Sequence, residues 1–323
     1  MRALMCREFG PPENLKVEEL EEPTAGPGQL LVQVHATAAT FPDALLVQDQ
    51  YQYKAQLPFI PGGEAAGVVL EVGEGVEDFA AGDRVCCGMM NGGFAERVAA
   101  NASSTRRLPS GLDFSAAPGL LYSYGTALYG LRDRGDARPG ESLLILGAGG
   151  SLGIAATEVG KMLGTRVIAA ASTPEKLELA RASGADEVID YSREDLKQRA
   201  KELTDGKGVD LVFDSVGGDY AEAALRSTAW EGRFLVIGFA AGIPKIPLNL
   251  ALLKGCQIVG VFLGSKSGRD PEWAGAMQRE LDALCADGRL NPQAAKAYPL
   301  EEAGRAMQDM IDRKAVGRLV VTP

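Results

Sequence analysis

Residues 147–153, GAGGSLG, place four glycines within seven positions, directly after the apolar run LLIL at 143–146. Gly147 would let the chain turn sharply off a strand, Gly150 would let a ligand approach the backbone, and Gly153 would let a following helix pack close to the sheet. A glycine turn at a helix start is typical of a site for a dinucleotide pyrophosphate. The same spacing also occurs in plain tight turns, so the motif alone leaves both interpretations open.

The next strand, TRVIAA at 165–170, indicates which nicotinamide cofactor the site would prefer. An NAD site wants a carboxylate near this point to accept from the ribose 2′-hydroxyl, and the strand here leads only into Ala171. Ser172, Thr173 and Lys176 follow, two hydroxyls and an ammonium that can surround a 2′-phosphate. The pattern therefore favours NADPH.

One residue supports the preference for NADPH, and two considerations weigh against it. Tyr191, after the third strand, could complete the pocket by hydrogen bonding or by lying against adenine. Ser172 and Thr173 could instead only cap a helix, with Lys176 a solvated surface charge. The charge of Glu175 would oppose a phosphate.

Strands and helices alternate along this part of the chain. Helices are expected from 151 to the stop at Gly164 and over 174–183, 193–203 and 219–227. Strands are expected at 143–146, 165–170, 187–190, 209–214, 233–238 and 257–262. Six apolar strands with helical crossovers predict an α/β fold with a doubly wound parallel sheet, covered on both faces.

Residues 1–123 differ, since short alternating strands are separated by Gly and Pro turns. They predict an antiparallel, barrel-like domain. The tail adds helices over 272–286 and 300–312 and a strand at 317–321. We expect a first domain of residues 1–123 that is rejoined by residues 264–323, a nucleotide domain of residues 124–263 inserted between them, and an active site in the cleft between the two.

Composition excludes several classes of function. The chain has 323 residues and a formal net charge of −10, which disfavours nucleic acid and anionic membranes as partners. Its five cysteines form no C-x-x-C pair, and the adjacent Cys86 and Cys87 are expected to be buried thiols. The single histidine, His35, lies in an alternating strand pattern. Because the chain has no other histidine, a catalytic triad elsewhere and a zinc site with two histidines are ruled out. With no signal peptide or membrane span in the sequence, a cytoplasmic location is expected.

Seven segments of the chain together carry a family resemblance. They are MRALMCREFGPPENLKVEE at the start, FPDALLVQDQYQYKAQLPFIPGGEAAGVVLEVG, AAGDRV, YGTALYGL, the glycine turn, KLELARASGADEVIDY and IPLNLALLKGCQIVGVF. They resemble the medium-chain dehydrogenase/reductase superfamily, and more closely its zinc-free NADPH:quinone oxidoreductase branch, which includes zeta-crystallin-like proteins. The resemblance covers the whole chain. It implies a six-stranded Rossmann sheet with a GroES-like catalytic domain.

The chain departs from the zinc-dependent members of the superfamily. Gly62-Gly63-Glu64 stands where they resemble G-H-E, and Thr40 stands where their first ligand cysteine would be. Their four-cysteine structural-zinc lobe is also missing. Without a Lewis acid, the expected substrates already accept hydride readily, as quinones and α,β-unsaturated carbonyl compounds do.

The resemblance also implies individual site residues. The nicotinamide is expected near Thr40, Thr126, Gly238 and Phe262, and Arg313 could reach the adenine-side phosphate or could simply be a helix C-terminal charge. Tyr51 is the candidate proton donor, with Tyr53 beside it as an equal suspect, although either could be a lid residue; Asp43 and Glu64 are expected to anchor loops. Further expected cofactor contacts are Ser151, Leu152, Val216 and Phe239.

Two other functions remain open at this point. An acyl-CoA enoyl reductase would need a basic patch for the CoA phosphates, for which Arg97, Arg106 and Arg107 are the clustered candidates. A non-catalytic NADPH-binding protein would need no catalytic residue at all. Either way, the apolar strand near 256–263 carries no internal Lys or Pro to discourage pairing, which predicts a homodimer joined edge to edge.

Overall fold

The computed structural model describes residues 1–109 and 111–323, which form two compact units. Unit 1 comprises Met1–Leu120 and Pro292–Pro323, and unit 2 comprises Leu121–Asn291. In this part of the chain, no helix combines the length and apolar character needed to cross a membrane.

Unit 2 is built on a six-stranded sheet in which every neighbouring pair is parallel. The strand order is β10-β9-β8-β11-β12-β13, so the order reverses between β8 and β11. The strands are β8 (Ser142–Leu146), β9 (Arg166–Ala171), β10 (Glu187–Asp190), β11 (Val209–Asp214), β12 (Thr228–Val236) and β13 (Gln257–Gly260). This confirms the doubly wound sheet.

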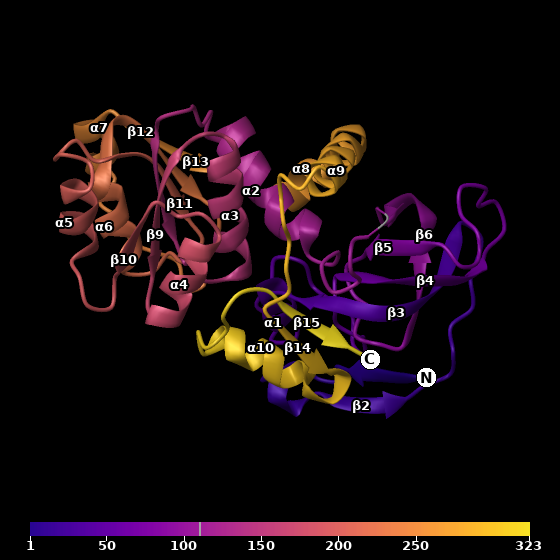
Figure 1. Ribbon diagram of the computed structural model, residues 1–323. Helices are drawn as coiled ribbons and strands as arrows, with labels where there is room; N and C mark the ends of the chain where they lie inside the picture. Colours follow the sequence, from indigo (N-terminus) through magenta and orange to yellow (C-terminus); the bar gives the residue numbers. More distant parts are fainter. Residues whose placement is uncertain (110) are drawn as a thin grey trace. The chain divides into compact units, whose positions relative to one another are not determined.

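Helices connect these strands and cover the sheet, as Figure 1 shows. They are α3 (Ser151–Met162), α4 (Pro174–Ala182), α5 (Leu196–Glu202), α6 (Tyr220–Ser227) and α7 (Asn249–Lys254). Every residue of β8 is buried, because the strand is central and both of its faces are covered. This explains why its sequence shows no alternation of polar and apolar residues.

The expected return of the chain to the first domain at residue 264 is wrong. The helices α8 (Leu263–Arg269) and α9 (Pro271–Ala286) remain in unit 2, and the chain leaves it after Asn291. Aromatic and ionic contacts hold α9 to the helical segment 121–134: Tyr129 meets Trp273 edge to face at 5.2 Å, and Arg132 pairs with Glu280 at 2.6 Å. An amphipathic pattern identifies a helix but does not say which unit its apolar face covers.

The helical segment 121–134 consists of π-helical turns at Leu121–Gly125 and Tyr129–Arg134 on either side of α2 (Thr126–Leu128). The predicted sixth strand ends early, at Gly260, so Phe262 precedes α8 instead of belonging to the sheet. Its exposed side chain therefore does not take part in strand packing.

Unit 1 contains a largely antiparallel sheet in the order β14-β15-β3-β4-β5-β7, with β6 also paired to β3, and a separate hairpin of β1 and β2. The strands are β1 (Arg2–Met5), β2 (Lys16–Glu19), β3 (Gln29–Ala39), β4 (Glu64–Val72), β5 (Arg84–Gly88), β6 (Arg97–Asn101), β7 (Thr105–Arg107), β14 (Lys296–Pro299) and β15 (Leu319–Thr322). The short helices are α1 (Phe41–Leu46) and α10 (Ala303–Ile311). His35 lies on β3, as predicted, with its ring stacked on Phe114 at 4.5 Å.

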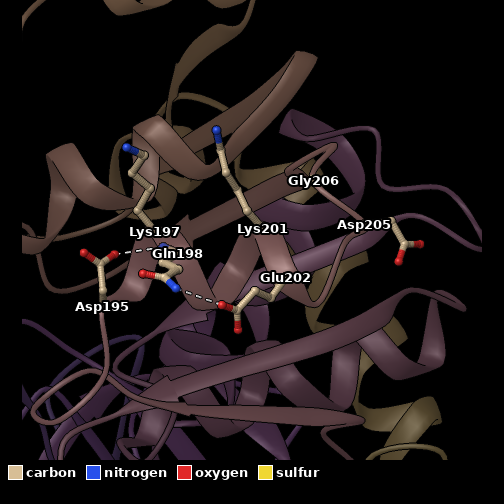
Figure 2. A pocket seen from close by; sticks show the side chains of 7 residues that line it. All are labelled: Asp195, Lys197, Gln198, Lys201, Glu202, Asp205 and Gly206. Carbon is tan, nitrogen blue, oxygen red and sulfur yellow. Dashed lines mark hydrogen bonds between the residues drawn. The ribbon is translucent and has the colours of Figure 1, made fainter.

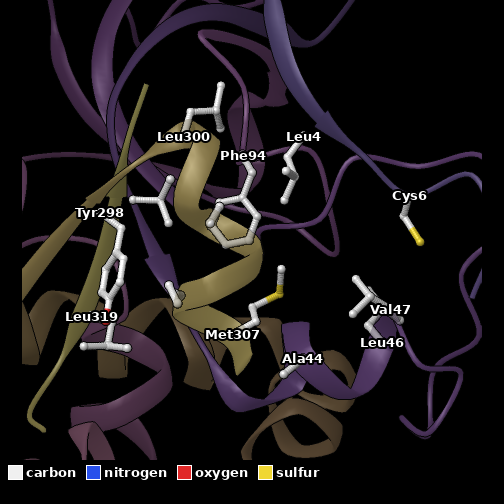
Figure 3. Close-up of a cluster of buried hydrophobic side chains, with 14 of the residues drawn as sticks. Leu4, Cys6, Ala44, Leu46, Val47, Phe94, Tyr298, Leu300, Met307 and Leu319 are labelled. Atoms are coloured by element: carbon white, nitrogen blue, oxygen red, sulfur yellow. The ribbon is translucent and has the colours of Figure 1, made fainter. Parts of the chain in front are cut away.

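The core of unit 1 joins the two ends of the chain. Leu4 from β1, Phe94, and Met307 from α10 are fully or almost fully buried in one cluster, seen in Figure 3. Ala44 and Leu46 of α1 belong to the same cluster. This packing fixes α1, and with it the residue that begins the helix, Thr40.

Candidate active site

The glycine turn lies between the end of β8 and the start of α3. Gly147 has a φ of 73°, and a Cβ built on it would lie 2.9 Å from Cγ2 of Val216, so both its conformation and its surroundings favour glycine. A Cβ on Gly153 would lie 2.3 Å from the carbonyl oxygen of Gly147. A Cβ on Gly150 would meet nothing nearer than that same oxygen, at 3.6 Å. Gly150 therefore leaves space on the loop that the protein itself does not fill.

The turn adjoins the carboxyl ends of three neighbouring strands. Ala148 N donates to Ala170 O on β9 at 3.0 Å, and Ser215 Oγ, just after β11, donates to Leu146 O at 3.1 Å. The order of the strands reverses here, and open α/β sheets bind ligands at such a point. The topology therefore marks this edge of unit 2 as the candidate cofactor site.

Asp214 organises the loop after β11, a role that sequence reasoning did not assign. Its buried Oδ1 accepts from the backbone N–H groups of Val216 and Gly217, each at 2.8 Å. Burial raises the pKa of this carboxyl, while the two backbone hydrogen bonds oppose the rise. The sequence signal that could have indicated this role is an Asp at the end of a buried strand.

The hydroxyl and ammonium groups after β9 lie at the start of α4. Thr173 is the N-cap residue, and its Oγ1 accepts from Lys176 N at 3.3 Å, so capping is part of its role. Tyr191 N donates to Ala171 O at 3.1 Å, which places Tyr191 beside the end of β9, and its ring lies 4.4 Å from that of Tyr220. The structure thus brings the backbone of Tyr191 next to the segment that starts with Ser172.

The other expected cofactor contacts of unit 2 differ in their accessibility. Ser151 and Ser123 share a hydrogen bond of 2.7 Å between their hydroxyls, and Thr126 is buried at the start of α2. Gly238 N donates to Asp214 O at 3.2 Å, which holds the end of β12 against β11. Leu152 is half-buried, Val216 is buried, and Phe239 and Phe262 are exposed.

Thr40 and Asp43 are joined by hydrogen bonds at the start of α1, in unit 1. Asp43 Oδ2 accepts from both the N–H and the hydroxyl of Thr40, at 2.9 and 2.5 Å, and Oδ1 accepts from Gly62 N at 3.2 Å. The carboxyl is only 3% exposed, and burial raises its pKa to about 6 against those hydrogen bonds. The sequence TFPD carried a helix-start signal, a Thr with an acidic residue three positions later.

Gly63 faces the same carboxylate. A Cβ built on Gly63 would lie 3.9 Å from Asp43 Oδ1, so Thr40 and Gly63, the two positions where the sequence resemblance implies lost zinc ligands, lie around one carboxyl group. Glu64 is buried beyond them and accepts from the Cys86 thiol at 3.6 Å. Within residues 1–109 and 111–323, no group of three or more His, Cys, Asp or Glu side chains is placed to hold a metal ion.

Tyr51 and Tyr53 lie in different surroundings. Tyr51 is half-buried and packs on the core of unit 1, whereas Tyr53 is 43% exposed. Burial raises the pKa of Tyr51, and the charge of Asp43 raises it further. Its phenol therefore keeps its proton at neutral pH, as a proton donor must.

The clustered arginines of unit 1 have partners of their own. Arg97 is paired with Glu22, and Arg107 is paired with Asp83 at 2.9 Å. Arg106 donates to the carbonyl oxygen of Ala117 at 3.4 Å. Two of the three candidates for a CoA phosphate patch are thus already neutralised by acidic side chains.

Arg313, the candidate for the adenine-side phosphate, follows α10. Its backbone is in the left-handed conformation, with a φ of 59°, and the residue is exposed.

A separate hollow of about 640 Å³ lies along α5 (Figure 2). Its lining is Asp195, Lys197, Gln198, Lys201, Glu202, Asp205 and Gly206. The acidic side chains cap or brace the helix: Asp195 accepts from Gln198 N at 2.8 Å, and Glu202 from Gln198 Nε2 at 3.0 Å. None of the expected site residues lines this hollow, so we assign it no part in the site.

Comparison with known proteins agrees with this geometry. Residues 26–110 match the alcohol dehydrogenase GroES-like domain family, and residues 151–281 match the zinc-binding dehydrogenase family. The chain is 38% identical over 326 residues to the quinone oxidoreductase-like protein 2 homolog of Nematostella vectensis. This match covers 99% of this chain and 88% of that protein. It is 35% identical over 320 residues to the quinone oxidoreductase of Pseudomonas aeruginosa, covering 98% and 97% of the two chains.

The crystal structure of Escherichia coli quinone oxidoreductase complexed with NADPH superposes with a TM-score of 0.90 at 29% identity, covering 100% of both chains. Similarity of sequence and of fold thus extends over both units. The chain belongs to the medium-chain dehydrogenase/reductase superfamily, in its quinone oxidoreductase branch.

Proposed function

We propose that this chain is an NADPH-dependent, zinc-independent reductase that transfers hydride to quinones or α,β-unsaturated carbonyl compounds. The observation that carries the proposal is the end of β9, where Ala171 leads into Ser172, Thr173 and Lys176 beside the glycine turn. A 2′-phosphate would find hydroxyls and an ammonium there and no carboxylate from the strand. The NADPH complex of the Escherichia coli relative supports the same cofactor.

The remaining cofactor contacts follow from the geometry of unit 2. We assign the pyrophosphate to the N-terminus of α3, where it would lie against the glycine turn at Gly147–Gly150, with Tyr191 on the adenine side. Gly238 and Phe239 follow β12 at the same edge of the sheet. NADPH, when bound, supplies the hydride.

Zinc independence is supported by what occupies the place of the ligands. The Thr40 hydroxyl is committed to Asp43, and Gly63 has no side chain to offer. A quinone or enone needs no Lewis acid to accept hydride, so binding, orientation and exclusion of water suffice. Alcohol oxidation, by contrast, would need the polarising metal.

Reduction of a carbon–carbon double bond places hydride on the β-carbon and requires a proton at the α-carbon. We assign Tyr51 as the donor, because it is protonated at neutral pH and partly shielded from water, whereas Tyr53 is more exposed. Tyr51→Phe should slow enone turnover by about 10²-fold or more, in the range typical of general acids, and should affect quinones less. Tyr53→Phe is the matched control; unchanged enone turnover in Tyr51→Phe would exclude the donor role.

The function is tested by NADPH oxidation with ortho- and para-quinones and with enals at catalytic enzyme concentration. Turnover is expected, and binding of NADPH without turnover would favour a non-catalytic binding protein. Comparison of a free enone with its CoA thioester tests the enoyl reductase alternative. The pairing of Arg97 and Arg107 with acidic residues favours the free enone.

We also propose a homodimer joined through the edge strand β13. The strand lies at the end of the sheet, and the exposed Leu252 and Leu253 of α7 precede it. A cytoplasmic location is part of the proposal, supported by the five cysteines, which form no disulfide among themselves.

A further inference from the structure

Gly149 is required by its contact with a side chain of α4 and not by its own backbone conformation. Its φ lies outside the left-handed region, unlike the 73° of Gly147, so its backbone conformation suits other residues as well. A Cβ built on Gly149 would nevertheless lie 2.3 Å from Cβ, 2.5 Å from Cγ and 2.9 Å from Cα of Lys176. The loop backbone at Gly149 is therefore the surface on which the base of the Lys176 side chain rests.

Lys176 cannot easily move away from that surface. Its backbone N–H donates to Thr173 Oγ1 at 3.3 Å, and Leu177 N donates to Thr173 O at 3.1 Å, which fixes the first turn of α4. Leu177 and Ala180 of the same helix are buried, so the helix cannot shift without disturbing the core. The crowded atoms are Cα, Cβ and Cγ, which are not the flexible end of the side chain.

We propose that Gly149 is a positioning residue for cofactor discrimination, because it lets the pyrophosphate turn lie directly against Lys176 and so sets the place of the ammonium relative to the bound dinucleotide. This inference rests on the proposed NADPH preference, in which Lys176 pairs with the 2′-phosphate. Glycine at 149 then serves the choice between NADPH and NADH, while glycine at 150 serves the approach of the pyrophosphate that both cofactors share.

Gly149→Ala tests this directly. The added methyl group must displace either the turn or the first turn of α4, and with it Ser172, Thr173 and Lys176. We expect the Kd for NADPH to rise about tenfold more than the Kd for NADH, comparable to the loss of one charge-assisted hydrogen bond. Fluorescence titration of both cofactors gives the two constants, and 2′,5′-ADP against 5′-AMP repeats the comparison without a pyrophosphate.

Gly150→Ala is the matched control. Its Cβ has an ordinary contact of 3.6 Å and does not touch Lys176. It should raise both Kd values by a similar factor and leave their ratio unchanged. In a Lys176→Ala background, where the ammonium is already absent, Gly149→Ala should change the ratio of the two Kd values much less than it does in the wild type.

The outcomes separate this inference from the proposed function. A wild-type protein without NADPH preference would overturn the proposed cofactor. A wild-type preference that persists in folded Gly149→Ala would overturn only the role of Gly149. If Gly149→Ala fails to fold, combination with Lys176→Gly removes two of the three crowded atoms and should restore folding; failure to do so would show that the requirement for glycine has another origin.

Discussion

Replacement of Asp43 by asparagine should change how the stability of unit 1 depends on pH. Burial raises the pKa of this carboxyl from its ordinary value of 3.8 to about 6. The folded protein therefore binds the proton more tightly than the unfolded chain does, and ionisation of Asp43 opposes folding. Its unfavourable contribution begins near the unfolded pKa and is complete only once the pH has risen through the folded pKa.

The two pKa values set the size of the effect. Linkage gives a loss of about 1.4 kcal/mol in the free energy of unfolding between about pH 5 and pH 7.5, out of about 3 kcal/mol over the whole titration. Asp43→Asn also changes the hydrogen bonds from Thr40 and Gly62, but that cost does not vary with pH. The difference in the free energy of unfolding between wild type and Asp43→Asn should therefore change with pH only through the titration of Asp43.

Urea unfolding at several pH values, followed by far-UV circular dichroism, measures this difference. Both tryptophans, Trp230 and Trp273, lie in unit 2, so their fluorescence identifies the transition of that unit separately. Asp83→Asn is the control: hydrogen bonds from Ala80 N and Arg107 lower the pKa of Asp83, so its titration ends below this pH window. Parallel pH profiles for wild type and Asp43→Asn would refute the argument.

Two further predictions follow from backbone packing and from the sheet edge. Gly153→Ala would place a methyl group 2.3 Å from Gly147 O, and it should lower the free energy of unfolding of unit 2 by about 1–3 kcal/mol. Urea unfolding followed by tryptophan fluorescence measures this change. Gly150→Ala is the control and should change stability much less. Gln257→Lys places a charge at an exposed position of β13 and should weaken an edge-to-edge dimer in sedimentation at micromolar concentration. A monomeric wild type would exclude the dimer, and a variant as dimeric as wild type would exclude this interface.

Much of unit 2 was predictable because its information is local. The apolar runs at 143–146 and 209–214 are strands buried on both faces, and such strands need no long-range information to be recognised. Gly147 and Gly153 follow from the turn that links a strand to a helix. The absence of a carboxylate after Ala171 is likewise visible in the sequence alone.

Other features depend on neighbours that are distant in the chain. Whether α9 joins unit 1 or unit 2 is decided by its contacts with Tyr129 and Arg132, which an amphipathic pattern does not encode. The raised pKa of Asp43 comes from burial by the core, which outweighs the opposing hydrogen bond from Gly62, nineteen residues away. The demand for glycine at 149 comes from Lys176 on α4, which is distant from the turn in the chain.

The sequence by itself determined the alternating α/β architecture and the place of the glycine turn, because both depend on residue type and local spacing. Tertiary structure decided which polar groups are shielded from water, which helices belong to which unit and which glycines are required by their neighbours. These depend on how side chains pack, and packing joins residues far apart along the chain.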